Sequence, residues 1–186
     1  MRAFLMALSV AALVASGAMS TQAAVQYPIA LTLDAKATTG VTTINSKLTV
    51  RVDRAMGDVS RTQVSNVLQK GGGYANFLNA LRPLPMLGAL ETQAAKVDIK
   101  YTREDPEGTG SRLVLVGDRP LFFLSPDPDR AKSPFQLTLV ELHFDGKGGV
   151  TGQMTGAARV RPSPEGGVLL DDYADQLVQL TGQVGK

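Results

Sequence analysis

The 186-residue chain contains no cysteine, no tryptophan and a single histidine. Without cysteine it can form neither disulfides nor thiolate sites, so its stability must come from packing and backbone pairing. A zinc site uses three or four His, Cys or carboxylate ligands, and one histidine leaves few of them. No Gly-x-Ser-x-Gly nucleophile elbow is present either. These absences favour a non-catalytic protein with no cofactor.

A strong charge of either sign is also lacking. The chain has 19 Lys and Arg residues against 17 Asp and Glu residues, and the basic residues are scattered along it. Nucleic-acid binding requires positive charge concentrated on one face. We therefore expect no nucleic-acid partner.

Only one long apolar run occurs, and it begins the chain. Arg2 precedes an apolar stretch that reaches about residue 18, and Thr21–Ala23 supplies small residues typical of a cleavage site. This pattern predicts a signal peptide, residues 1–23, cleaved after Ala23, with cleavage after Ala24 as the alternative. The run is shorter than the roughly 20 residues that span a bilayer. We expect a periplasmic or secreted protein with a single domain, residues 24–186, that is not integral to a membrane.

After this segment, most of the chain has the pattern of short strands. In "SKLTVRVDR" (46–54) apolar side chains alternate with polar ones, which is typical of a strand with one solvated face. An N-terminal strand within residues 25–35 precedes it, and a connection rich in Thr and Gly spans residues 34–43. The later strands are expected at Lys96–Thr102, Arg112–Val116, Leu121–Leu124, Phe135–Asp145, Val150–Arg161, Val168–Tyr173 and Leu177–Gly182.

One segment changes to helical spacing. Ser60 and Gln63 form a capping-box pattern, and the apolar residues that follow recur at three- and four-residue intervals. Gly71–Gly73 interrupts the pattern, and a second apolar stripe continues to Leu81 before prolines end it. The sequence predicts two short helices, at about residues 60–81. The fold class expected is β-rich α+β: a curved antiparallel sheet, sandwich or partly open barrel with this helical pair packed on it.

Two neighbouring strands suggest where a ligand would bind. In "FQLTLVELHFD" (135–145) the apolar face changes midway, as happens when a strand bulges, bends or has a helix packed behind half of it. The next strand has little side-chain volume because of its glycines and alanines, so another backbone, the helices or a ligand must approach it. We expect packing there first, and a pocket for a small apolar ligand as the functional alternative. The candidate ligand-binding residues are Tyr74, Phe77, Leu78, Gly152, Met154 and Gly156.

Metal chemistry is the weaker alternative. Glu141, His143 and Asp145 share one face of a strand, but same-face neighbours lie roughly 7 Å apart along it. The solvated face of the strand explains them more simply. Two carboxylate-rich loops, at residues 127–129 and 171–175, lack the ligand spacing of an EF-hand. The Asp-Gly-Lys-Gly-Gly stretch after Phe144 is best explained as a hairpin whose glycines supply positive φ.

Several of these motifs together resemble a group of exported bacterial proteins of unknown function. The similarity covers roughly residues 46–181, and its most specific parts are "DRP" (118–120), "DGKG" (145–148) and "YADQ" (173–176). The group has arginine where this chain has His143, which implies a solvated strand position there. No activity, cofactor or catalytic residue follows from the resemblance.

Three functions remain open from the sequence. The leading one is a non-catalytic periplasmic or secreted binding module, for a small apolar ligand or an envelope protein. The second is a metal-assisted or carboxylate-based hydrolase at Glu141, His143 and Asp145. The third is a structural envelope component.

Overall fold

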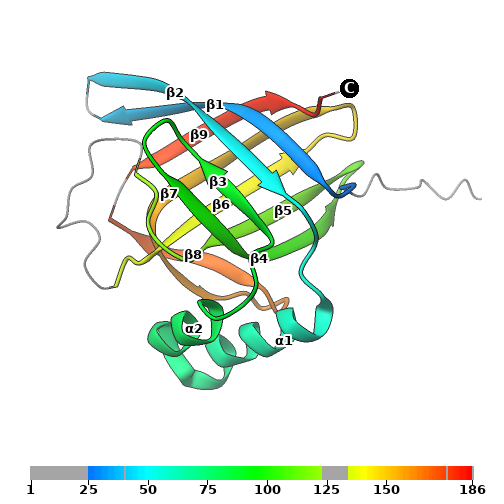
Figure 1. The fold of residues 1–186 in the computed structure, drawn as a ribbon, viewed down its shortest axis with the longest axis vertical. Helices are drawn as coiled ribbons and strands as arrows, with labels where there is room; N and C mark the ends of the chain where they lie inside the picture. The colour runs from blue at the N-terminus through cyan, green and yellow to red at the C-terminus, as the bar shows by residue number, and fades with distance from the viewer. Residues whose placement is uncertain (1–24, 40, 123–133, 175, 186) are drawn as a thin grey trace, which may run out of the picture.

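The computed structural model describes residues 25–39, 41–122, 134–174 and 176–185; the expected leader, residues 1–23, lies outside them. Eight antiparallel strands form a closed barrel, and β8 extends the sheet beside β7 (Figure 1). The strands are β1 (Ile29–Thr39), β2 (Thr42–Val52), β3 (Gly88–Glu91), β4 (Lys96–Glu107), β5 (Gly110–Gly117), β6 (Leu137–Phe144), β7 (Gly149–Pro162), β8 (Val168–Tyr173) and β9 (Leu177–Gln183). The β-rich α+β fold expected from the sequence is confirmed.

Barrel closure depends on β6 and β7. Strands β1 to β6 pair in chain order, β6 also pairs with β7, and β9 joins β7 back to β1. Side chains directly opposite in a ladder project to the same face. One such row runs round the barrel, and its apolar members are buried: Ala35, Leu180, Leu142 and Leu113. The barrel interior is therefore filled by aliphatic side chains, as is usual for eight strands.

A second apolar layer lies outside the barrel wall. A register shift between Ile99 and Tyr101 in β4 turns the Tyr101 side chain away from the interior that Ile99 faces. Tyr101 is fully buried, and its hydroxyl lies 3.5 Å from Ser65 Oγ on the helix that covers this wall. Leu139 belongs to the same outer row, through Val116. Leu139 is 6% exposed, so the outward-facing side chains in this half of β6 are buried as well.

The helical pair consists of α1 (Asp58–Val67), a kinked turn (Leu68–Gly72) and α2 (Gly73–Leu81). Gly71, with a φ of 77°, breaks the helix where the glycines predicted a break. The prediction of a capping box at Ser60 is wrong, because α1 begins earlier, at Asp58. Its N-cap residue is Gly57, and no side-chain hydrogen bond caps the helix there. Both helices lie along the outside of the barrel, near β4 and β8 in Figure 1.

Tyr74 fastens α2 to the barrel. Its hydroxyl donates a hydrogen bond to the Ala158 carbonyl oxygen of β7 (2.9 Å) and accepts one from the Gln136 backbone N–H just before β6 (2.9 Å). Burial raises the pKa of the Tyr74 hydroxyl to about 12, partly offset by the Gln136 hydrogen bond and by Arg82 and Arg159. The hydroxyl therefore stays protonated at neutral pH and can donate.

Several expected boundaries differ from the structure. The connection expected at residues 34–43 is instead the paired ends of β1 and β2, with Thr38 opposite Thr43. The break expected after Thr102 is also strand, because β4 continues to Glu107. Strand β3 was not expected at all. No strand forms at Leu121 and Phe122, and the rest of that expected strand lies outside the described residues.

Within the described ranges, no helix is long and apolar enough to cross a membrane.

Replacing Tyr74 by Phe tests how the helices are fastened. The change leaves the Ala158 carbonyl and the Gln136 N–H without their side-chain partner, so we expect the free energy of unfolding to fall by about 1–3 kcal/mol. Urea denaturation measures this loss. Tyr173→Phe is the matched control, because Tyr173 is 43% exposed, and it should change stability by less than about 0.5 kcal/mol. Equal effects of the two changes would contradict the account.

Candidate functional site

The six candidate ligand residues all have packing or hydrogen-bonding roles. Phe77, Leu78 and Met154 are buried in the hydrophobic core, and Tyr74 makes the hydrogen bonds described above. The Gly156 carbonyl oxygen accepts a hydrogen bond from the Leu121 N–H. Of the four pockets characterised in the described part of the chain, none is lined by any of the six. A ligand role for them stays a prediction, and their positions favour the packing explanation.

Gly152 shows why β7 has little side-chain volume. A Cβ atom at this position would lie 2.2 Å from the Glu141 carbonyl oxygen of β6, a contact that real Cβ atoms do not make. Glycine is therefore required by the close approach of another backbone.

Gly152→Ala should destabilise the protein through that clash. We expect a loss of about 1–3 kcal/mol in the free energy of unfolding, since β6 and β7 must separate to admit a methyl group. Thermal or urea unfolding measures it, with Gly185→Ala as the control, because an added Cβ there meets nothing within 4 Å. An unchanged stability for Gly152→Ala would contradict the explanation.

Glu141, His143 and Asp145 do not converge on one point. Asp145 Oδ1 accepts hydrogen bonds from the backbone N–H groups of Lys147 (2.7 Å) and Gly149 (2.9 Å), so its carboxylate stabilises the β6–β7 hairpin. These hydrogen bonds, led by that from Lys147, hold the pKa of Asp145 below its usual value. Among the described residues, no group of three or more His, Asp or Glu side chains is placed to hold a metal ion.

Glu141 instead belongs to an ion-pair ladder on the outer face of β4, β5 and β6. Its Oε1 lies 2.6 Å from Arg112 Nε and 3.3 Å from His143 Nε2. The other ring nitrogen of His143 lies 2.5 Å from Glu107 Oε2. Burial raises the pKa of Glu141, but the hydrogen bond and charge of Arg112, with His143, outweigh it, so the pKa is lowered. His143 therefore has a structural role between two carboxylates.

The lowered pKa of Glu141 predicts a pH dependence of stability. A carboxylate with a depressed folded-state pKa stabilises the fold above its unfolded pKa, about 4.3, and this contribution is lost as pH falls through the folded pKa. Glu141→Gln should lower the free energy of unfolding by about 1 kcal/mol at pH 7, because the side chain is only 20% exposed. Urea unfolding at pH 7 and pH 3 should show the difference from wild type shrinking at low pH. A difference independent of pH would contradict this.

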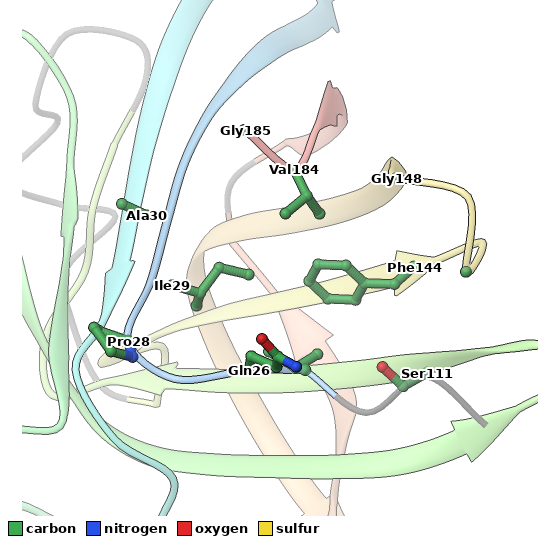
Figure 2. Close-up of a pocket in the computed structure, with 11 residues that line it drawn as sticks. Gln26, Pro28, Ile29, Ala30, Ser111, Phe144, Gly148, Val184 and Gly185 are labelled. Carbon is green, nitrogen blue, oxygen red and sulfur yellow. The ribbon is translucent and has the colours of Figure 1, made fainter. Parts of the chain in front are cut away.

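A cavity lies at one mouth of the barrel (Figure 2). Its volume of about 510 Å³ falls within the roughly 300–1,000 Å³ typical of small-molecule sites. Figure 2 shows the side chains of Ile29, Phe144 and Val184 pointing toward one another across it. The lining residues are Val25, Gln26, Pro28, Ile29, Ala30, Ser111, Phe144, Gly146, Gly148, Val184 and Gly185.

Distant parts of the chain form this mouth because several strands begin or end there. Phe144 ends β6, Ile29 begins β1, and Val184 follows β9. The Val184 N–H donates a hydrogen bond to the Gly148 carbonyl oxygen (2.9 Å), which fixes the C-terminal segment to the β6–β7 hairpin. Gly146 and Gly148 have φ values of 73° and 101°, as the expected glycine hairpin requires.

The cavity combines an apolar wall with uncharged polar groups. None of the described residues that line it is Lys, Arg, Asp or Glu. Ser111 is 2% exposed, and its Oγ has no hydrogen-bond partner within the described structure. A buried hydroxyl without a partner costs about 1–3 kcal/mol, so a ligand group that bonds to it would be favoured. Figure 2 shows this Oγ directed toward the side of the cavity where Gln26 lies.

Sequence reasoning missed this site because its residues come from four separate segments, 25–30, 111, 144–148 and 184–185. The sequence pattern predicted Phe144 to be one of the apolar residues of a long strand. It placed Ser111 in the loop before the strand expected at Arg112–Val116. Only the strand register brings them together, with Ser111 directly opposite Phe144. The glycine hairpin was the one available signal, because it predicts a turn at the end of two long strands.

Two other cavities are less suited to an apolar ligand. One of about 350 Å³ includes Arg54 and Lys100, but Lys100 Nζ already donates to the Leu84 carbonyl oxygen (3.0 Å). Another of about 250 Å³ is lined almost entirely by polar residues of α1, β4 and the β7–β8 turn.

Comparisons with protein-family models, with curated proteins and with solved structures returned no match to this chain. The resemblance to a group of exported proteins stays a prediction, and the functional argument rests on the geometry of the barrel mouth.

Proposed function

We propose that the protein is a non-catalytic binding module that holds a small, uncharged, largely apolar molecule at the barrel mouth. The observation that carries this proposal is the pairing of an apolar cavity with one buried hydroxyl, Ser111 Oγ, that has no hydrogen-bond partner in the described part of the chain. The described lining residues include no His, Lys, Asp or Glu that could act as a base for Ser111, which favours binding over catalysis.

The chemistry of the wall defines the ligand class. Ile29, Phe144 and Val184 offer apolar contacts, and burying each methylene of a ligand against them contributes about 0.8 kcal/mol. Ser111 and Gln26 can bond to one hydroxyl, carbonyl or ether group. An ionic headgroup would lose hydration without gaining an opposite charge from the lining residues, so we expect neutral molecules to be preferred. Export to the periplasm or medium, expected from the sequence, would give the protein access to such molecules.

The neutral fluorophore N-phenyl-1-naphthylamine provides a direct binding assay. Val184→Trp should weaken its binding by about tenfold or more, because the larger ring occupies the cavity and a loss of 1.4 kcal/mol is tenfold. Val59→Trp is the matched control: Val59 is 73% exposed on α1 and is not among the described residues that line the cavity, so the change should leave the affinity unaltered. Fluorescence titration measures both dissociation constants.

Two further results would bear on the proposal. The anionic analogue 8-anilinonaphthalene-1-sulfonate should bind more weakly than the neutral probe. Native mass spectrometry of protein purified from its own cellular compartment should show a co-purifying molecule. Absence of both probe binding and a bound molecule would refute the proposal and favour a structural envelope role.

A further inference from the structure

Glu104 is a charged residue in a row of the barrel wall whose neighbours on β5 and β6 are apolar. It lies opposite Leu113 of β5, which lies opposite Leu142 of β6, and both leucines are fully buried. Because opposite residues project to the same face, Glu104 points to the interior side of the wall. A half-buried carboxylate there loses hydration and needs a compensating partner.

Among the described residues, no lysine or arginine forms an ion pair with Glu104. The donor that approaches it is the backbone nitrogen of Val25, 2.7 Å from Oε1. The Val25 nitrogen can reach Glu104 because β3 pairs with β4 only as far as Ile99. Beyond Ile99, β3 does not cover this edge of β4, and the N-terminal segment approaches it instead.

Tyr27 shows that the N-terminal segment is packed against this part of the barrel. Burial, followed by the negative charge of Glu104, raises the pKa of the Tyr27 hydroxyl to about 12, while Arg61 lowers it. The segment then continues into the wall of the barrel-mouth cavity through Gln26 and Pro28. The contact with Glu104 therefore holds in place the N-terminal residues that line the barrel-mouth cavity.

We propose that Val25 is the first residue of the mature protein and that its α-ammonium group forms an ion pair with Glu104. An amide nitrogen offers this carboxylate one hydrogen, whereas an ammonium at the same atom offers three and adds a positive charge in direct contact with it. The inference depends on removal of a leader and not on the identity of any ligand. It moves the expected cleavage from the Ala23–Ala24 bond to the Ala24–Val25 bond.

The processing step is peptide hydrolysis by a leader peptidase of the exporting cell. Water adds across the Ala24–Val25 bond, so Ala24 leaves with a carboxylate and the Val25 nitrogen becomes a primary amine. The amine takes up a proton at neutral pH, since α-amino groups have pKa values of about 7.7–8.0. The charge of the resulting ammonium is then balanced by Glu104, so the adjacent cavity stays close to neutral.

Intact-mass measurement of the protein exported from the full-length chain tests the position of cleavage. The expected product begins at Val25. A product that begins at Ala24, or at any other residue, overturns the inference, and so does a chain that keeps its leader.

Amine labelling tests the ion pair separately. Pairing with Glu104 should raise the pKa of the Val25 amine and reduce its reactive neutral form about tenfold per pKa unit at neutral pH. Glu104→Gln should therefore label faster than wild type, whereas the control Glu91→Gln, which breaks an exposed pair with Lys96, should not. Equal rates for wild type and Glu104→Gln overturn the ion pair.

Should Glu104→Gln fail to fold, the pH profile of labelling in the wild-type protein decides the question. An apparent pKa above the range of a free α-amine supports the pair, and one within that range overturns it.

Discussion

The pairing of β6 with β7 is the constraint on which the rest of the structure depends. It closes the barrel, and it requires Gly152 because the two backbones approach too closely for a Cβ atom. It also fixes the register that places Val140 and Leu142 inside the barrel while Leu139 faces outward. A strand that is buried on both faces has an almost continuous run of apolar residues in its sequence, and β6, "LTLVELHF", is an example.

This double burial also determines where a ligand can bind. Met154 and Phe77 are fully buried, and neither is among the described residues that line the cavities discussed above. The strand ends at the mouth are different, because the N-terminal and C-terminal segments complete the wall there. The carboxylate of Glu104 and the hydrogen bond from Val184 to Gly148 hold these two segments in place.

The sequence predicted the features that depend on local pattern. Alternation identified most strands, glycines identified the hairpin after Phe144 and the break at Gly71, and the face change in β6 indicated two packing layers. It could not predict β3, which is only four residues long. It also could not predict that β4 shifts register at Tyr101, or that Ser111 would lie opposite Phe144. These depend on pairing between strands far apart in the chain, which periodicity does not specify.

A backbone amide NMR titration with N-phenyl-1-naphthylamine tests the central claim most directly, because it distinguishes the mouth from the helical wall. The account predicts that the largest chemical-shift changes occur at Gln26, Ser111, Phe144 and Val184, with the amides of α2 unaffected. Changes centred on Tyr74 and Phe77, or spread evenly over the barrel, would contradict it.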